Sequence, residues 1–222
     1  MSPRAAYCDV DGTLTATDIV MPLNWFKRQL SPFPSYAAWM ASLLFRGPYW
    51  LLLDKLSRGA SNREIYCNYA GMNTKQVKQL AAQCYTQCLR PRLRQIAVQR
   101  IEDLKREGFA IVLVTGGLDF IMRPLAEELG AELIAPALLE AGGVFTGALD
   151  REPLTGKHKA DALRAHAQDR GIDLAESFAF GDAFGDLDML ECVGHPVAVS
   201  PGRRLENIAR QRNWMIVNWR EP

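Results

Sequence analysis

The sequence has almost no excess of charge of either sign. Its 222 residues include 26 Lys and Arg against 25 Asp and Glu, which gives a formal net charge of +1. Without a strong positive field, the composition gives no reason to expect nucleic acid as a partner. The basic stretch from Arg203 to Arg212 also contains Glu206, and we interpret it as a solvated helix face rather than a nucleic-acid patch.

Long uninterrupted apolar runs are also missing. The most apolar part of the chain is interrupted by Arg46-Gly47-Pro48 and preceded by Pro32 and Pro34. These interruptions argue against a membrane-spanning helix. The first residues, Met1 to Arg4, lead directly into an apolar strand, so no signal peptide is expected.

Cysteine is sparse, with five residues whose spacing does not match that of metal ligands. Cys84 and Cys88 lie one helical turn apart. We interpret them as two small apolar residues on one helix face rather than as a metal or redox pair. Reduced thiols predict a cytoplasmic or equivalent reducing compartment.

What the sequence does contain is a pair of acids directly after a short apolar run, in Asp9-Val10-Asp11-Gly12-Thr13. If residues 5–10 form a buried strand, both acids lie at the carboxyl edge of a sheet, where open α/β folds bind ligands. One carboxylate can attack phosphorus, the second can protonate the leaving oxygen, and the amides after Gly12 can hold phosphate oxygens. The pattern favours phosphoryl transfer. The alternative is an ordinary surface turn, because Asp-Gly is a common turn dipeptide.

Two later segments carry groups that bind phosphate. The apolar run at residues 111–114 ends in Thr115-Gly116-Gly117, whose hydroxyl and amides can bind a phosphoryl oxygen. Lys157-His158-Lys159 opens a helical stretch and can supply a cation between a nucleophile and a phosphate.

A fourth segment carries further acids. The apolar run Phe178-Ala179-Phe180 ends in Gly181-Asp182, and Asp186 and Asp188 follow. Carboxylates at a strand end, together with an incoming phosphate, are the hard oxygen ligands that Mg²⁺ prefers. The sequence therefore predicts a magnesium site here. Asp188 is equally well explained as a solvated residue or a helix cap.

In their order and spacing, these four segments resemble the haloacid dehalogenase (HAD) superfamily, and within it the branch that contains phosphoserine phosphatase. The match consists of Asp-x-Asp-Gly-Thr at residues 9–13, Thr115 with Gly116, Lys159, and Gly181-Asp182 with Asp186, and it spans nearly the whole chain. The resemblance implies a Mg²⁺-dependent phosphomonoester phosphatase that works through an aspartyl-phosphate intermediate.

The resemblance also implies a role for individual residues. Asp9 would be the nucleophile and Asp11 the general acid and base. Asp186 would be a further metal ligand or would orient the metal's waters. The expected phosphate-binding residues are Gly12, Thr115, Gly116 and Lys159, and the expected metal ligands are Asp9, the backbone carbonyl of Asp11, Asp182 and Asp186.

Other activities remain open at this point. An acid at position 11 favours ester hydrolysis, because by the same resemblance ion-pumping ATPases carry Thr there and dehalogenases lack this acid. A phosphomutase keeps the same acid pair. A catalytically inactive binding protein with this fold is a further alternative. A phosphate-accepting receiver domain is disfavoured by Asp11-Gly12-Thr13 and by the long insertion that follows.

Residues 1–16 and 89–222 alternate strand-like and helical patterns, which predicts an α/β fold with a doubly wound, Rossmann-like parallel sheet. We expect a helix over 91–107, a strand ending at Val114, and a helix over 118–129. The segment from Glu132 to Leu149 contains Gly142-Gly143 and predicts a β-hairpin near the active face.

Residues 17–88 instead have helical patterns throughout, and we interpret them as an inserted α-helical cap domain. Two four-residue patterns, Ser61 to Glu64 and Asn73 to Gln76, predict helix starts. Asp18 occupies the place where phosphoserine phosphatases carry a Glu that contacts the substrate amine. It can equally cap a helix beginning near Ile19.

The cap is expected to select the substrate. Binding of a serine carboxylate would need Arg46, Arg58 or Arg63, between which the sequence does not decide. No acid occurs between Asp18 and Asp54, and eleven of the chain's twenty aromatic residues lie between positions 25 and 85. This suits an anionic lipid headgroup or a peripheral membrane contact, with the cap's own core as the alternative. We therefore expect a small-metabolite or lipid-headgroup monophosphate as substrate, with phosphoserine as the alternative.

Overall fold

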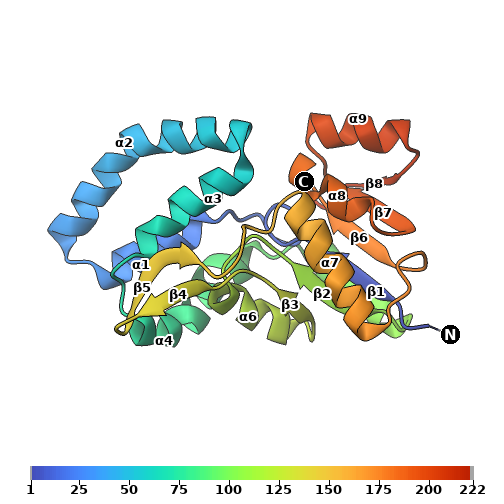
Figure 1. The fold of residues 1–222 in the computed structure, drawn as a ribbon, viewed down its shortest axis with the longest axis horizontal. Coiled ribbons are helices and arrows are strands. Elements are labelled where there is room, and N and C mark those ends of the chain that lie inside the picture. Colours follow the sequence, from blue (N-terminus) through green and yellow to red (C-terminus); the bar gives the residue numbers. More distant parts are fainter. Residues whose placement is uncertain (1, 221–222) are drawn as a thin grey trace.

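The computed structural model describes residues 2–220 of the chain. Its centre is a six-stranded sheet in the order β3-β2-β1-β6-β7-β8, in which all neighbouring strands are parallel. Helices cover both faces of this sheet (Figure 1). The predicted doubly wound α/β fold is therefore confirmed. The strands are β1 (Ala5–Cys8), β2 (Ala110–Val114), β3 (Glu132–Ile134), β6 (Phe178–Gly181), β7 (His195–Val199) and β8 (Met215–Val217).

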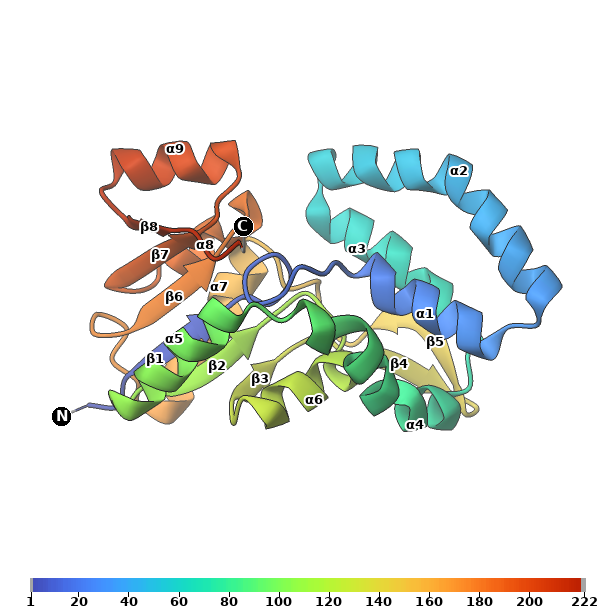
Figure 2. The ribbon, with the colours of Figure 1, turned by 180° about the vertical axis from the view of Figure 1, so that it is seen from behind.

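The central strands are buried on both faces. In β1, Ala6 and Cys8 belong to the core beneath α5 (Gln95–Arg106) and α6 (Asp119–Glu128), whereas Ala5 and Tyr7 belong to the core on the opposite face. Figure 2 shows α5 and α6 together on one side of the sheet. Because successive side chains of a strand point to opposite faces, double burial requires an unbroken apolar run. The other face is covered by α7 (Lys157–Arg170), α8 (Leu187–Leu190) and α9 (Arg203–Gln211).

Residues 20–92, called the helical segment below, form only helical elements and lie to one side of the sheet (Figures 1 and 2). They cover most of the range predicted for the inserted cap, and the boundaries at 16 and 89 stay a prediction. Among residues 2–220, no helix is both long and apolar enough to cross a membrane. The elements are α1 (Val20–Leu30), α2 (Phe33–Leu56), α3 (Arg58–Tyr66), η1 (Cys67–Tyr69), α4 (Thr74–Cys84), the π-helical η2 (Tyr85–Leu89) and η3 (Arg90–Arg92).

The chain leaves the sheet at residues 14–16 and returns beside them at residues 92–94, so that the two segments form one short hydrogen-bonded ribbon. The Ala16 amide donates to the Arg92 carbonyl, and the Arg94 amide donates to the Leu14 carbonyl, both at 2.9 Å. The Arg94 guanidinium also donates to the Gly12 carbonyl at 3.1 Å. The helical segment is therefore attached directly beside the loop that carries Asp9 and Asp11.

One of the two predicted helix starts is wrong. Helix α3 begins at Arg58, because Ser57 is its N-cap and its hydroxyl accepts from the Ala60 amide at 3.3 Å. Ser61 lies inside the helix, where its hydroxyl donates to the Trp50 carbonyl of α2 at 3.3 Å. The second start is confirmed, since the Asn73 side chain caps α4 by accepting from the Gln76 amide at 3.0 Å.

The predicted hairpin over 132–149 is partly wrong. Residues 132–134 form β3, the parallel edge strand of the main sheet, rather than a hairpin arm. The hairpin consists of β4 (Leu138–Ala141) and β5 (Val144–Leu149), which are antiparallel. Gly142 and Gly143 make the turn at φ +57° and +79°, a backbone region in which side chains other than glycine are strained.

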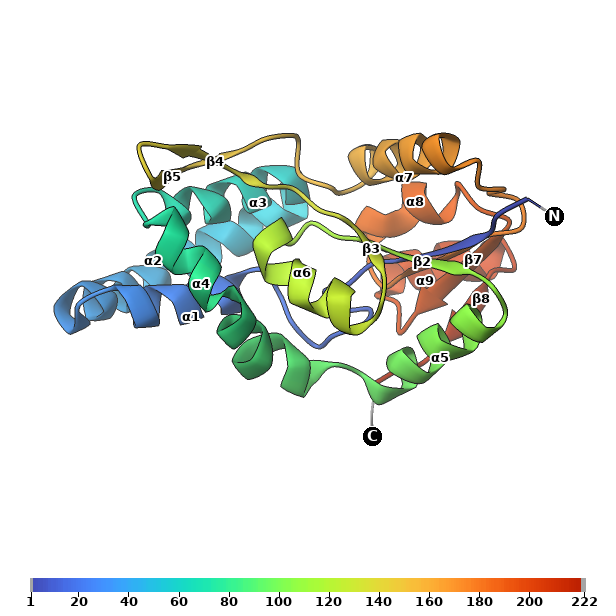
Figure 3. The ribbon, with the colours of Figure 1, turned by 90° about the horizontal axis from the view of Figure 1, so that it is seen from below.

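The hairpin packs on the helical segment instead of on the sheet (Figure 3). The Phe145 amide donates to the Met72 carbonyl at 3.0 Å, and the Phe145 carbonyl accepts from the Gly71 amide at 2.9 Å. The Phe145 ring is 1% exposed and stacks on Phe120 of α6 at 5.5 Å between centroids. Phe145 therefore joins the helical segment to a helix that flanks the sheet.

We expect Phe145→Ala to lower the free energy of unfolding by about 3 to 5 kcal/mol, because a fully buried aromatic ring is replaced by a cavity. Urea titration followed by circular dichroism measures the change. Ala148→Ser, at an exposed position of the same strand, is the control and should change it by less than about 0.5 kcal/mol. Equal losses in both variants would contradict this account of the packing.

Candidate active site

Asp9 directly follows β1, and both of its carboxylate oxygens are held. The Lys159 ammonium donates to Oδ1 at 2.6 Å, and the Thr13 hydroxyl donates to Oδ2 at 2.9 Å. The Asp9 amide donates to the Phe180 carbonyl of β6 at 3.0 Å. The side chain is 6% exposed. Its orientation at the carboxyl edge of the sheet is therefore fixed by contacts on three sides.

Lys159 lies in the first turn of α7 and is 2% exposed. Its ammonium contacts Asp9 Oδ1 and Asp186 Oδ1, each at 2.6 Å. Burial lowers the pKa of Lys159, but Asp186 and Asp9 outweigh this effect and the net shift of the pKa is upward. A buried ammonium is stable only when it is paired. Lys159 therefore stays a cation inside the site.

Asp182 and Asp186 complete a cluster of three carboxylates with Asp9. One carboxylate oxygen from each residue lies within 4.8 Å of the others. Burial, with the nearby charges of Asp9 and Asp186, raises the pKa of Asp182 to about 7. The three carboxylates thus hold more negative charge than Lys159 neutralises. Clustered oxygen donors with surplus negative charge fit Mg²⁺.

Gly12 makes the turn between the two acids of the first motif. Its φ is +89°, and a Cβ at this position would lie 2.4 Å from Asp182 Oδ2. Both the backbone and the neighbouring carboxylate therefore require glycine. Beyond the turn, the Thr17 hydroxyl donates to Asp11 Oδ1 at 2.7 Å. Burial raises the pKa of Asp11 to about 6 despite this hydrogen bond.

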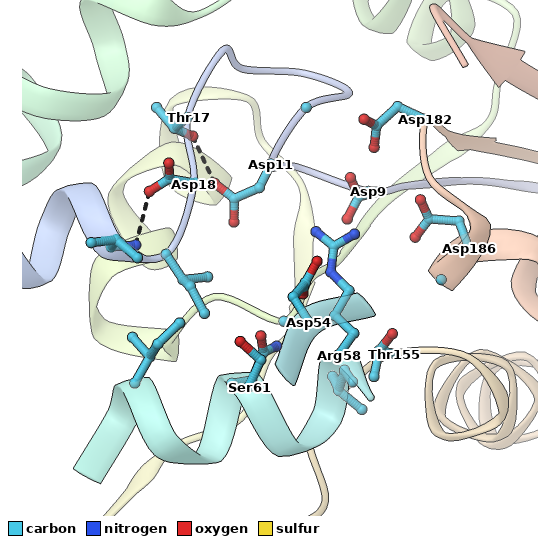
Figure 4. Close-up of a pocket in the computed structure, with 18 of the residues that line it drawn as sticks. Asp9, Asp11, Thr17, Asp18, Asp54, Arg58, Ser61, Thr155, Asp182 and Asp186 are labelled. Carbon is cyan, nitrogen blue, oxygen red and sulfur yellow. Dashed lines mark hydrogen bonds between the residues drawn. The ribbon is translucent and has the colours of Figure 1, made fainter. Parts of the chain in front are cut away.

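A cavity of about 350 Å³ opens over these residues, between the sheet edge and helices α2 and α3 (Figure 4). Thr115 is fully buried and is not part of the cavity wall, and its hydroxyl accepts from the Gly117 amide at 2.9 Å. The other predicted site residues are brought together in the wall: Asp9, Asp11, Gly12, Asp18, Gly116, Lys159, Asp182 and Asp186.

The model of the haloacid dehalogenase-like hydrolase family matches residues 6–191. The chain belongs to this family. The chain is 32% identical over 171 residues to an "Inhibition of morphological differentiation protein" of Streptomyces azureus, and this match covers 76% of the chain. The chain spans 61% of the length of that relative.

Two further similarities extend over nearly the whole chain. It is 28% identical over 229 residues to the phosphoserine phosphatase SerB1 of Mycobacterium tuberculosis, covering 97% of this chain and 71% of that one. A crystal structure of a Bordetella pertussis protein with unknown function has the same fold, with a TM-score of 0.85 at 22% identity over 99% of this chain and 100% of that one. The predicted likeness to the phosphoserine phosphatase branch is confirmed.

Asp18 caps α1, because its Oδ1 accepts from the amides of Val20 and Met21 at 2.9 and 3.0 Å. The carboxylate also lines the cavity. The capping interpretation of Asp18 therefore describes its hydrogen bonds, while contact with a substrate amine stays a prediction.

The sequence does not decide which arginine reaches the cavity over Asp9. Arg58, the first residue of α3, lines the cavity, and its guanidinium points toward Asp9 (Figure 4). Arg46 instead lies 3.9 Å from Glu64, and Arg63 pairs with Glu152. No sequence motif marks Arg58, because its approach to Asp9 depends on how α3 packs over the sheet edge.

The cavity wall also contains an apolar part that no motif predicted. Most of these residues come from α1, α2 and α3 or the loop before α1. Tyr66 of α3 supports this side, since its buried hydroxyl donates to the Gly116 carbonyl at 2.6 Å. The apolar wall consists of Ile19, Val20, Trp50, Leu51, Ile65 and Leu154.

The carboxylate cluster predicts an unusual pH dependence of stability without metal. The pKa values of Asp11 and Asp182 rise from 3.8 to about 6 and about 7 on folding. Between pH 3.8 and these raised values, the folded state binds more protons than the unfolded state. The stability that the two carboxyl groups contribute is therefore lost as the pH rises through this range. In EDTA we expect the Tm of wild type to fall as the pH rises from about 5 to about 8. This fall should be at least about 2 °C larger than the fall of the Tm of Asp182→Asn over the same pH range.

Thermal unfolding followed by circular dichroism measures both proteins. Mg²⁺ should raise the Tm of wild type most at the higher pH, where the carboxylates are ionised, and should have little effect on Asp182→Asn. Asp169→Asn, at an exposed position of α7, is the control and should behave as wild type. Parallel pH curves for wild type and Asp182→Asn would contradict the charge surplus.

Proposed function

We propose that this chain is a Mg²⁺-dependent phosphomonoester phosphatase that forms an aspartyl phosphate on Asp9. The observation that carries the proposal is the pair formed by a fixed carboxylate and a second acid two residues away. Both oxygens of Asp9 are held by Lys159 and Thr13, and burial raises the pKa of Asp11 to about 6. One acid is thus positioned to attack, and the other can carry a proton near neutral pH.

In the first half of the proposed reaction, an Asp9 oxygen attacks phosphorus and the ester P–O bond breaks. The leaving alkoxide takes the proton of Asp11, which becomes a carboxylate. Lys159 and the backbone amide of Gly116 would hold the phosphoryl oxygens. The Gly12 amide, which the sequence also predicts for this role, donates to the Thr15 carbonyl at 2.9 Å in this structure. The sequence also predicts Thr115 for this role, but Thr115 lies outside the cavity wall in this structure.

In the second half, the Asp11 carboxylate accepts a proton from water, and the water oxygen attacks the phosphorus of the aspartyl phosphate. The bond to Asp9 breaks, phosphate leaves, and Asp11 is again protonated. Asp9, Asp182 and Asp186 would hold Mg²⁺, with the Asp11 carbonyl as the fourth predicted ligand. When bound, Mg²⁺ supplies positive charge that offsets the repulsion between the nucleophile and the phosphate.

The inactive-protein alternative is less well supported. A fold that kept only a binding role would not need the buried carboxylates of Asp9 and Asp186, the half-buried one of Asp182 and a buried ammonium, because burying such charges is costly. Asp9 and Lys159 are nonetheless buried and paired. A phosphomutase would use the same residues, and it differs only in the acceptor of the phosphoryl group.

Phosphoserine is a second candidate substrate, and two residues of the cavity wall favour it. Asp18 could bind an ammonium, and Arg58 could bind a carboxylate. Against this, Asp18 Oδ1 already accepts two backbone amides. Phosphoserine also has no apolar group that could pack against the apolar wall formed by Trp50, Leu51 and Ile65. A monophosphate with an apolar portion uses both parts of the wall.

We expect Asp9→Asn to reduce phosphate release to the background rate, because an amide cannot act as the nucleophile. Asp11→Asn should lower the rate by about 10² to 10⁴-fold through loss of general acid and base catalysis. Colorimetric phosphate release is measured with Mg²⁺ or EDTA on phosphoserine, a sugar phosphate, p-nitrophenyl phosphate and lysophosphatidate. Asp169→Asn is the matched carboxylate control and should keep the wild-type rate.

Three results would overturn the proposal. Release that is unchanged in EDTA would exclude the metal requirement. Release that persists in Asp9→Asn would exclude the aspartyl phosphate. Transfer of the phosphoryl group to an added sugar without release of free phosphate would identify a phosphomutase.

A further inference from the structure

The outward side of α2 is apolar along its whole length. Phe33, Met40, Leu44 and Leu51 follow one line on the helix at spacings of seven and four, and Phe45, Leu52 and Leu56 follow a second line. These residues are between 40% and 81% exposed. Soluble monomers rarely expose a contiguous apolar surface of this kind. The α2 outer face consists of Phe33, Met40, Leu44, Phe45, Leu51, Leu52 and Leu56.

The opposite side of α2 already has its packing partners. Trp50 is 5% exposed, and Trp39 and Leu43 pack partly buried against the same hydrophobic core. Figures 1 and 2 show α2 as the outermost element of the helical segment, with α1 and α3 on its inner side. The sequence allows two interpretations of the aromatic residues of the helical segment, as its own core or as an exposed contact surface, and the structure contains residues of both kinds. Trp25, Phe26, Trp50, Tyr66 and Tyr69 are core, whereas Phe33 and Phe45 are exposed.

In residues 19–66, which contain α1, α2 and α3, cations outnumber acids six to two, and the two acids are Asp54, which lines the cavity, and Glu64, which lies 3.9 Å from Arg46. Residues 19–53 contain Lys27, Arg28 and Arg46 and no acid, although the whole chain has a net charge of only +1. Lys55 adds an exposed cation near the end of α2. An anionic bilayer complements exposed apolar side chains accompanied by cations. A second copy of this chain would instead bring like charges together.

The α2 outer face is continuous with the cavity over Asp9. Leu51 belongs to both, because it lines the cavity and is 69% exposed. Trp50, the preceding residue of α2, also lines the cavity from its buried side. Ile65 and Leu154 belong to the same apolar wall of the cavity, which Asp9 also lines. A ligand with its phosphate at Asp9 can therefore lie along apolar side chains until it reaches the outer surface of α2.

We propose that the α2 outer face binds an anionic lipid bilayer and that the cavity takes a lipid phosphomonoester, whose apolar portion leaves the cavity past Leu51. The substrate class rests on the phosphatase activity proposed above, whereas bilayer binding does not. The phosphate would lie at Asp9 and Lys159. The membrane would hold the protein so that the cavity mouth opens toward the lipid headgroups.

Bilayer binding is tested by cosedimentation with vesicles of phosphatidylglycerol and phosphatidylcholine, and with vesicles of phosphatidylcholine alone. The test variant replaces Leu44, Phe45 and Leu52 with Ser, which leaves the cavity wall and the inner side of α2 unchanged. We expect wild type to prefer the anionic vesicles and the variant to bind them at least about tenfold more weakly. The matched control replaces Ile96, Leu139 and Met215 with Ser, at exposed apolar positions outside α2, and should bind as wild type.

The substrate class is tested by two rates measured with Mg²⁺. On lysophosphatidate in anionic vesicles, we expect the α2 variant to be at least about tenfold slower than wild type. On soluble p-nitrophenyl phosphate, both proteins should have the same rate, which shows that the variant is folded and catalytically intact. If wild type hydrolyses neither compound but binds vesicles, the proposed activity fails while the docking surface stands.

Other results would overturn the inference itself. Wild type that does not bind anionic vesicles, or a variant that binds them equally, would exclude the docking surface. Size-exclusion chromatography in which wild type is a dimer and the α2 variant a monomer would identify a second copy as the occupant. Faster hydrolysis of phosphoserine than of lysophosphatidate would exclude the lipid substrate.

Discussion

The buried ammonium of Lys159 holds together three parts of the chain that are far apart in sequence. It contacts Asp9 after β1 and Asp186 at the end of the short 3₁₀ helix η4 (Phe184–Asp186), and Lys159 itself lies in the first turn of α7. Desolvation of three charged groups is unfavourable, and mutual attraction offsets it only when the geometry is close. The sheet supplies that geometry, because parallel β1 and β6 end at the same edge and place Asp9 and Asp182 side by side. The positions of the remaining acids, the Gly12 turn and the cavity follow from this arrangement.

Much of the sheet and of the site's charged residues could be predicted from the sequence, because β1, β2 and β6 are buried on both faces and form short apolar runs. The residues that follow such runs must lie at one edge, which is why Asp9, Gly116 and Asp182 could be assigned to one site. The sequence misled where burial is partial. Strand β3 is only half-buried, and its pattern wrongly predicts a hairpin arm. The error at Ser61 has another cause, because Ser57, four residues earlier, is also a good capping residue and is the one that caps α3.

Features that depend on packing between distant segments left no sequence signal. Arg58 reaches the cavity because α3 lies over the sheet edge, and neither its neighbours nor its spacing from Asp9 sets it apart from Arg46 or Arg63. The aromatic residues of the helical segment were visible, but α2 is apolar on most of its circumference. Its sequence therefore could not indicate that Trp50 faces inward and Phe45 faces outward. Only the packing of α1 and α3 against one side of α2 decides this.

The ribbon through which the chain leaves the sheet and returns has a further consequence. Ala16 and Arg92 are hydrogen-bonded neighbours although 75 residues lie between them. The sheet-side part of the chain therefore needs almost no extra length to close on itself if that insertion is replaced or shortened. Such an attachment suits the exchange of one insertion for another during evolution. Because Arg94 also contacts the Gly12 carbonyl, each new insertion would be joined next to the same unchanged chemistry.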